Sequence, residues 1–302
     1  MRAVRFSRFG GPEVLEIDEL PDPHPGPGEV RIAVRAAGVN ASDWKKRQGL
    51  MDPDLPQTLG YEAAGVVDEV GGGDAHAKVG DRVFGFCTDG AAQAELAVLS
   101  HYAPVPTALD FVDVAALPAA VETAARALDH LGVTDGTTVL VNGASGSVGS
   151  AAVQLAVARG ARVIGTASPR NHDLLRSFGA EPVAYGDGMA ERVRALAPDG
   201  VDLALDVAGS GVLPELVELA GGAENVVTVA DFPGAREHGV RFSRGDEGRA
   251  LYVLGQIGGL VRSGKLRLPE VRTFPLDDVA KAHRAGESGG GHRKIVLTVD
   301  VP

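Results

Sequence analysis

The sequence predicts an α/β protein in which a β-rich N-terminal segment is followed by alternating strands and helices. Over the first hundred residues, short runs of alternating polar and apolar residues are separated by glycine and proline turns, which is typical of a small barrel-like β module. From residue 137 onward, strand and helix patterns alternate, which favours a parallel sheet with helices on both faces. Between residues 137 and 160, an apolar strand, a glycine-rich turn and a helical pattern follow one another directly.

Length, charge and cysteine content narrow the class of protein. With 302 residues the chain is long enough for two domains, and its formal net charge of −11 argues against nucleic acid or an anionic membrane as a general partner. The single cysteine, Cys87, excludes an intrachain disulfide and lies in an apolar strand pattern, so a buried side chain is expected. No run approaches the roughly 18 apolar residues of a membrane span, and the N-terminus lacks an apolar signal core, so a cytoplasmic protein is expected.

The N-terminal segment is predicted to contain several short strands and one helix. Its strand patterns cover residues 2–6, 14–17, 29–37, 63–70, 81–86 and 94–98. The prolines between residues 21 and 27 form a turn-rich connection. The alanine-rich stretch 114–131 has helical spacing and no internal glycine, so it predicts one continuous helix.

The remainder of the chain is predicted to form a sheet with connecting helices and then to return. Its predicted strands are 137–142, 161–167, 182–185, 201–207 and 225–230, and its predicted helices are 147–159, 170–178, 188–196 and 211–220. A helix over 247–263, a strand over 266–274, a helix over 276–285 and a strand over 295–299 follow, with the glycines at 289–291 in a loop. We therefore predict an N-terminal domain over 1–118, an inserted α/β domain over 119–264 and a C-terminal return over 265–302.

The glycine turn at 143–149 carries the most specific chemical signal in the sequence. Its residues are Gly143, Ala144, Ser145, Gly146, Ser147, Val148 and Gly149. Glycines at such a turn let the backbone turn sharply and approach a pyrophosphate, whose charge then lies at the N-terminus of the following helix. The turn therefore predicts a dinucleotide site, with a plain strand–turn–helix connection as the alternative.

Several segments occur in the same order in one known family. They are 36–43 (AAGVNASD), 59–67 (LGYEAAGVV), 79–83 (VGDRV), 116–118 (ALP) leading to Thr123, 142–149 (NGASGSVG) and 294–297 (KIVL). With them the chain resembles the medium-chain dehydrogenase/reductase superfamily, and within it the zinc-free quinone oxidoreductase branch, the ζ-crystallin-like enzymes. The resemblance implies a GroES-like β-rich catalytic domain with an inserted Rossmann parallel-sheet domain.

The resemblance also identifies the positions where a catalytic metal would be held. Zinc-dependent members of the superfamily place a cysteine at position 40, a histidine at 61 and a third ligand at 119, whereas this chain has Asn40, Tyr61 and Ala119. None of these is a usual zinc ligand, and Glu62 alone does not make a site, so no metal is expected. Without a Lewis acid, hydride acceptors that delocalise negative charge are favoured, namely quinones and α,β-unsaturated carbonyls.

The residues after the second strand of the inserted domain indicate which nicotinamide cofactor binds. NAD-binding domains carry an acidic residue there for the ribose 2′-hydroxyl, but no carboxylate occurs before Asp173. Arg170 and Ser168 instead suit a 2′-phosphate, and His172 lies in the same turn. By resemblance, Tyr185 helps to bind that phosphate. NADPH is the expected cofactor; the alternative is that Arg170 lies in solvent and Tyr185 packs on the sheet.

The candidate catalytic residues come from the resemblance. It implies that Asn40 lies near the nicotinamide, where its amide can donate to a substrate oxygen as charge develops; the alternative is that Asn40 caps the following turn. Tyr61 either lines the pocket, donates its hydroxyl or is simply packed. Asp43 and Trp44 are expected to shape the substrate pocket. Protonation of the product is left to water, because the tyrosine that some relatives carry nearby is absent.

Thr123 is expected by resemblance near the nicotinamide, with an ordinary helix threonine as the alternative, and further cofactor contacts are expected at the carboxyl ends of the strands. These further contacts are Thr166, Val207, Ala230, Asp231 and Phe232. A homodimer joined through the edge of the sheet is also implied, with 240–242 as the candidate edge strand. The stretch 234–248, rich in arginine and glycine, is interpreted as a shortened linker.

The sequence thus predicts an NADPH-dependent, zinc-independent reductase of quinones or activated α,β-unsaturated carbonyls, acting on a small-molecule acceptor. Two alternatives stay open. One is an enoyl-thioester reductase of a biosynthetic pathway, for which the basic stretch 45–47 would form the rim of the site. The other is a non-catalytic nucleotide-binding protein of the ζ-crystallin type.

Overall fold

The structure is a computed structural model and describes residues 1–87, 90–245, 248–288 and 293–300. Its tertiary contacts fall into two units, each assembled from discontinuous parts of the chain. Unit 1 comprises Met1–Ala119, Leu254–Gly258 and Leu268–Pro302. Unit 2 comprises Ala120–Val253 and Gly259–Arg267. No helix among the described residues is long and apolar enough to cross a membrane.

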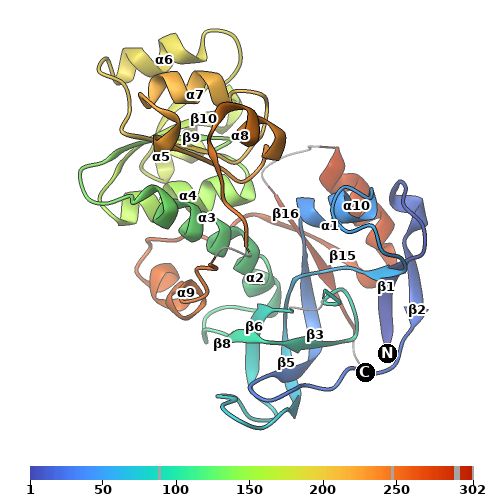
Figure 1. Ribbon diagram of the computed structural model, residues 1–302. Coiled ribbons are helices and arrows are strands. Elements are labelled where there is room, and N and C mark those ends of the chain that lie inside the picture. Colours follow the sequence, from blue (N-terminus) through green and yellow to red (C-terminus); the bar gives the residue numbers. More distant parts are fainter. Residues whose placement is uncertain (88–89, 246–247, 289–292, 301–302) are drawn as a thin grey trace. The chain divides into compact units, whose positions relative to one another are not determined.

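Unit 1 is built on a seven-stranded sheet with the order β15-β16-β3-β5-β6-β8, in which β7 also pairs with β3 (Figure 1). These strands are β3 (Val30–Val39), β5 (Glu62–Val70), β6 (Arg82–Phe86), β7 (Leu96–Leu99), β8 (His101–Pro104), β15 (Val271–Pro275) and β16 (Lys294–Thr298). A smaller sheet has the order β2-β1-β4, formed by β1 (Arg2–Phe6), β2 (Glu16–Glu19) and β4 (Gln57–Thr58).

The alternation that predicts strand 29–37 determines which side chains of β3 are buried. Val30, Ile32 and Val34 are fully buried in the core of unit 1, because alternate residues of a strand face the same side of the sheet. The strand pairs antiparallel with β16, where Val39 lies opposite Ile295, and with β5, where Ala37 lies opposite Ala63. The end of β3 therefore lies beside the beginnings of β16 and β5.

Two helices of unit 1 are joined by a buried charged side chain. Arg47, in α1 (Ala41–Arg47), is fully buried and hydrogen-bonds to His283 and Glu287 of α10 (Val279–Glu287). Burial and the neighbouring guanidinium lower the pKa of His283 to about 3.

Unit 2 is a six-stranded parallel sheet with the order β11-β10-β9-β12-β13-β14, the Rossmann arrangement in which the first strand lies centrally. Its strands are β9 (Thr138–Asn142), β10 (Arg162–Ala167), β11 (Glu181–Ala184), β12 (Leu203–Asp206), β13 (Val226–Thr228) and β14 (Arg241–Phe242). The predicted edge strand 240–242 is confirmed as β14.

Helices cover both faces of this sheet, as the strand–helix alternation predicts. Figure 1 shows α3 (Pro118–Leu131) and α4 (Ser147–Ala158) on one side and α6 (Met189–Leu196) and α7 (Leu213–Leu219) on the other. Leu140 and Ile164 of the sheet pack in one core with Met189 and Leu216 of the second pair. Helix α5 (His172–Ser177) follows β10.

Several predicted elements are wrong in extent. The predicted helix 114–131 is two helices, α2 (Phe111–Ala115) and α3, because Pro118 lacks an N–H and disfavours helical backbone at the residue before it. The predicted helix 247–263 is shorter, as α9 (Val253–Arg262), and the strand predicted at 266–274 lies later, as β15. The glycines at 289–291 fall outside the described residues.

Two α-helices and two strands of the described residues were not predicted, one of the strands being the two-residue β4. The interpretation of 234–248 as a linker is wrong over its first part, because α8 (Phe232–His238) forms there. Asp231 accepts a hydrogen bond from Gly234 N at 2.8 Å and so caps α8. Helix α1 and strand β8 were also missed, because neither is long enough to show a clear period.

Candidate functional site

The glycine turn has the geometry of a phosphate-binding turn. Gly143 has φ +82°, in the left-handed region that favours glycine. A Cβ at Gly149 would lie 2.2 Å from Gly143 O, so α4 packs directly against the turn only because residue 149 has no side chain. The first backbone N–H groups of α4 lack partners within the helix. The residues present therefore fit a dinucleotide with its pyrophosphate at this helix N-terminus.

A chain of buried polar side chains joins the carboxyl ends of four neighbouring strands. Thr166 of β10 donates to Asn142 Oδ1 of β9 at 2.7 Å, and Asn142 Nδ2 donates to Asp206 Oδ1 of β12 at 2.9 Å. Thr228 of β13 donates to Asp206 Oδ2 at 2.7 Å. All four are at most 2% exposed. We call these four residues the strand-end network.

The strand-end network also holds the loops that follow the strands. Thr166 Oγ1 accepts from Gly143 N at 3.0 Å, and Asp206 Oδ1 accepts from the backbone N–H groups of residues 208 and 209, both at 3.0 Å. Thr228 Oγ1 accepts from the N–H groups of residues 230 and 231, both at 3.1 Å. Thr166, expected as a cofactor contact, thus lies inside the network and supports the glycine turn.

The other expected contacts at this edge lie nearer the surface. Val207, Ala230 and Asp231 are half-buried, and Phe232 is 52% exposed and packs edge-on against Phe242. Because they follow β12 and β13, they lie at the carboxyl edge of the sheet, as expected.

The residues expected around a 2′-phosphate follow two adjacent strands. Ala167 of β10 pairs with Ala184 of β11, so Ser168 and Tyr185 leave the same edge of the sheet at matching positions. Tyr185 is 62% exposed and does not pack on the sheet. Arg170 is exposed, and its guanidinium forms no ion pair with another described residue.

Two neighbouring side chains shape the turn that carries Arg170. His172 Nε2 lies 3.3 Å from Ala167 O, so its ring is held against the backbone. Asn171 Nδ2 donates to Ser145 Oγ at 3.1 Å and so joins this turn to the glycine turn.

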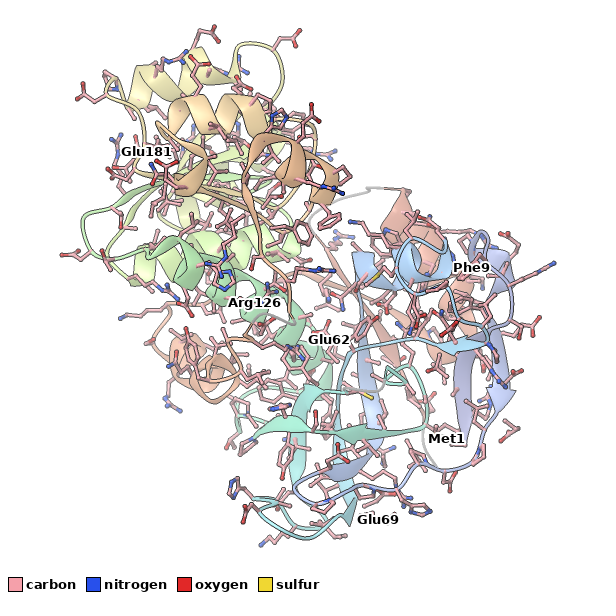
Figure 2. The ribbon with its side chains drawn as sticks, in the orientation of Figure 1. Met1, Phe9, Glu62, Glu69, Arg126 and Glu181 are labelled. Atoms are coloured by element: carbon pink, nitrogen blue, oxygen red, sulfur yellow. The ribbon has the colours of Figure 1, made fainter. Side chains whose placement is uncertain are left out.

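In unit 1, Asn40 is part of a cluster with Glu62 and Lys294. Asn40 Nδ2 donates to Glu62 Oε1 at 2.8 Å, Lys294 Nζ donates to the same oxygen at 2.7 Å, and Lys294 also donates to Asn40 Oδ1. Glu62, labelled in Figure 2, is fully buried and Lys294 is 2% exposed, whereas Asn40 is half-buried. Asn40 also lies at the N-cap position of α1, as the alternative interpretation expects.

The remaining positions that hold ligands in zinc-dependent relatives lie beside this cluster. Glu62 Oε2 accepts from Ala119 N at 2.7 Å, so one carboxylate binds residues 40 and 119. Tyr61 is half-buried, and burial first and the charge of Asp43 second raise the pKa of its hydroxyl. Among the described residues, no three histidine, cysteine, aspartate or glutamate side chains are grouped so that they could hold a metal.

Asp43 and Trp44 support α1. Asp43 is fully buried and accepts from Asn40 N at 2.7 Å and Gly60 N at 3.2 Å, and burial raises its pKa to about 6. The Trp44 ring packs edge-on against His283, 6.4 Å between centroids, and fills the space beside Gly286. Asp43 therefore holds the backbone of Asn40, and Trp44 packs α1 against α10.

The remaining expected contact, Thr123, lies on α3 and is half-buried. Its Oγ1 accepts from Arg126 Nη2 at 3.4 Å, and Arg126 pairs with Glu122 at 2.9 Å in the interior of unit 2. Cys87 is buried, as expected.

Several side chains that order this site were not predicted from the sequence as site residues: Glu62, Lys294, Asn142, Asp206 and Thr228. The sequence does contain a pattern that predicts Asn142, Asp206 and Thr228. Each is a polar residue at the end of an apolar strand, just before a turn, and α/β sheets bind ligands at that edge. Lys294 lies too far from Asn40 in sequence for any local pattern to connect them.

Comparison with known proteins agrees with this geometry. The family model described as "Alcohol dehydrogenase GroES-like domain" matches residues 26–112, and that described as "Zinc-binding dehydrogenase" matches residues 147–246. Quinone oxidoreductase of Rattus norvegicus is 38% identical over 321 residues, covering 98% of this chain and 97% of the relative. The 2-methylene-furan-3-one reductase of Solanum lycopersicum is 32% identical over 315 residues, covering 98% and 79%.

A solved structure shares the fold over its whole length. The Escherichia coli quinone oxidoreductase complexed with NADPH superposes with a TM-score of 0.83 at 25% identity, covering 99% of this chain and 100% of that chain. The glycine turn and the Rossmann strand order fit the pyridine-nucleotide cofactor of such an enzyme. The chain is therefore an oxidoreductase that belongs to the medium-chain dehydrogenase/reductase superfamily, in its quinone oxidoreductase branch.

Proposed function

We propose that this protein is an NADPH-dependent reductase that transfers hydride to quinones or activated α,β-unsaturated carbonyls without a metal ion. The observation that carries the proposal is the cluster of Asn40, Glu62 and Lys294. At position 40, where zinc-dependent members place a cysteine ligand, this chain has an amide held by a buried ion pair. The names of the rat and tomato relatives, a quinone oxidoreductase and an enone reductase, support the acceptor class.

The preference for NADPH rests on the residues after β10 and β11. The exposed Arg170 guanidinium offers a fixed positive charge and paired N–H donors to a 2′-phosphate. Ser168 and Tyr185 leave the same edge of the sheet and add hydroxyl groups. No carboxylate stands at the end of β10 to bind a free ribose 2′-hydroxyl. The Escherichia coli structure was determined with the same cofactor.

The bound cofactor supplies the hydride. The protein's part is to orient the acceptor and to stabilise the negative charge that develops on its oxygen. Asn40 Nδ2 has an N–H for that oxygen, while Asp43 holds the Asn40 backbone in place. Because a neutral amide stabilises an oxyanion less than a metal ion does, acceptors that spread charge over a quinone ring or an enolate are favoured. Tyr61 and Trp44 are proposed to border the acceptor site.

Assembly and location complete the proposal. We expect a homodimer that extends the Rossmann sheet through its edge strand β14. A single buried cysteine is in keeping with a reducing, cytoplasmic setting. Sedimentation analysis of the purified protein tests the dimer.

The function is tested by following oxidation of NADPH and NADH with quinones, enones and enoyl thioesters. We expect turnover of quinones and enones, with NADPH preferred over NADH. Faster turnover of enoyl thioesters would favour a biosynthetic enoyl reductase instead. Tight NADPH binding without turnover of any acceptor would favour a non-catalytic nucleotide-binding protein.

A further inference from the structure

The contacts of Asn40 determine which way round its side-chain amide lies. Lys294 Nζ can only donate, so the atom that faces it must be Oδ1, and the Glu62 carboxylate can only accept, so the atom that faces it must be Nδ2. Turning the amide over would place its oxygen against the carboxylate and its N–H group against the ammonium. Hydrogen-bond chemistry therefore permits one orientation.

In that orientation one N–H of Asn40 remains available. Nδ2 carries two hydrogens, and only one of them donates to another described residue, Glu62. Glu62 and Lys294 are buried, whereas Asn40 is only half-buried. Of the three polar groups, the amide is the one that a bound molecule can reach.

Glu62 alone would weaken this donor. Its carboxylate lies 2.8 Å from Asn40 Nδ2, and a negative charge there opposes a second negative charge developing on a substrate oxygen. The Lys294 ammonium lies 2.7 Å from the same carboxylate oxygen, so it cancels that charge. It also donates to Asn40 Oδ1, which polarises the amide and strengthens its N–H as a donor.

The backbone is shaped around this pair. A Cβ at Gly38 would lie 2.1 Å from Glu62 Oε1, so any larger residue at position 38 would displace the carboxylate. The antiparallel pairing of β16, β3 and β5 brings positions 294, 40 and 62 to the same end of the sheet.

We propose that Lys294 is a positioning residue for the reaction, acting through Asn40: it fixes the orientation of the amide and neutralises Glu62 so that the free N–H can stabilise an oxyanion. This rests on the proposed function, in which Asn40 contacts the acceptor.

The test is a set of variants measured with a quinone acceptor. Lys294→Met removes the ammonium group and keeps a side chain of similar length, whereas Lys294→Arg keeps the positive charge. Glu62→Gln combined with Lys294→Met removes both charges and is called the doubly neutral variant. Each is made in the native chain and with Asn40→Ala. Lys281→Met is the matched control, because Lys281 forms only an exposed pair with Asp278.

We expect Lys294→Met to lower kcat by about 10- to 100-fold, with little change in the KM for NADPH. Lys294→Arg should recover most of this loss, and the doubly neutral variant part of it, because the uncompensated carboxylate is gone. In the Asn40→Ala background, Lys294→Met should change kcat less than about twofold. If Lys294 acts only through Asn40, its removal has no further effect once Asn40 is gone. Lys281→Met should leave kcat unchanged.

The proposal would be overturned if Lys294→Met lowered kcat equally in both backgrounds, or if Asn40→Ala left kcat unchanged. Should Lys294→Met fail to fold, the same comparison is made with the doubly neutral variant in the two backgrounds, because removing both charges of a buried pair costs little stability. Failure of the proposed function is a separate result, since the native chain would then turn over no acceptor at all.

Discussion

Arg170 is the residue on which the proposed preference for NADPH depends. It stands two residues after Ser168 in the turn that follows β10, and its guanidinium is exposed and unpaired among the described residues. Replacing Arg170 with alanine should raise the KM for NADPH by about 10- to 100-fold, the value of a hydrogen bond to a charged group. The KM for NADH should stay the same, because NADH has no 2′-phosphate.

Steady-state kinetics with both cofactors decide this, with Arg176→Ala as control. Arg176 pairs with Asp173 on the exposed face of α5, so its loss removes a similar charge from the same region. Equal effects of Arg170→Ala on both cofactors would show that Arg170 does not read the 2′-phosphate.

Asp43 gives the stability of the protein a specific pH dependence. Burial raises its pKa to about 6, above the roughly 3.9 of an unfolded aspartate. Between about pH 4 and 6 the native state therefore binds more protons at this site, and the contribution of Asp43 to stability falls as the pH rises. Relative to Asp43→Asn, the native chain should lose at most about 3 kcal/mol of unfolding free energy across this window.

Urea unfolding of both proteins at several pH values measures this difference. The comparison with Asp43→Asn is needed because the lowered pKa of His283 acts in an overlapping range with the opposite sign, destabilising the fold as the pH falls. A difference between the two proteins that stays constant from pH 4 to 6 would contradict the prediction.

Single site residues could be predicted from the sequence, but the contacts that some of them make could not. Asn40 could be found from its place in the NASD segment. The partners that orient it could not, because Lys294 is separated from it by 254 residues and only strand pairing brings them together. Asp43 accepts from the backbone N–H of Asn40, a role that the expected place at the substrate pocket did not suggest.

Among the secondary-structure elements, the strand-end network is the feature most open to test. Asp206 accepts four hydrogen bonds, one each from β9 and β13 and two from the loop that follows its own strand. Both carboxylate oxygens of Asp206 accept hydrogen bonds, so in Asp206→Asn the side-chain NH2 group faces a group that is itself a donor. The lost hydrogen bond should cost about 1–3 kcal/mol of unfolding free energy. Because the loops at 143, 208–209 and 230–231 lose their common support, the KM for NADPH should rise several-fold.

Asp202→Asn is the matched control, because Asp202 precedes the same strand at the opposite edge of the sheet and accepts from Thr138 N. It should leave the KM for NADPH unchanged. The prediction would fail if Asp206→Asn had the same small effect as Asp202→Asn on both unfolding and cofactor binding.

The contact between α4 and the glycine turn is a second test of an element. A Cβ at position 149 would lie 2.2 Å from Gly143 O, which the backbone cannot accommodate without moving the helix. Gly149→Ala should therefore weaken NADPH binding by tenfold or more and destabilise unit 2 by about 1–3 kcal/mol. Gly255→Ala is the control, since a Cβ there meets nothing within 4 Å. Equal NADPH affinity of the two variants, measured by calorimetry, would contradict the role given to Gly149.

Most of the strands and helices could be predicted because the spacing of their apolar residues is clear. The parallel strands of unit 2 are mostly short apolar runs bounded by glycine, and β3 alternates between buried and partly buried residues over 30–35. Short capped helices such as α1 and α8 could not be predicted, because their ends are fixed by Asp43 and Asp231 and not by an apolar period.

For the whole molecule, the chemistry divides between the two units. Unit 2 contains the glycine turn, the strand-end network and Arg170, which suit a dinucleotide, and unit 1 contains the buried ion pair and Asn40, which suit an acceptor oxygen. That division could be predicted from sequence, because the β-rich and alternating segments differ so clearly in pattern. The proposal that the chain works without a metal depends on the residues at positions 40, 61 and 119, which are Asn, Tyr and Ala.

The most direct measurement is therefore the initial rate of NADPH oxidation with a quinone before and after exhaustive treatment with a chelator. Metal content is measured in parallel, and zinc is then added back. If the protein is a metal-free reductase whose acceptor oxygen is bound by Asn40, the rate is the same before chelation, after chelation and after zinc is added back. A rate that falls with chelation and returns with zinc would contradict it.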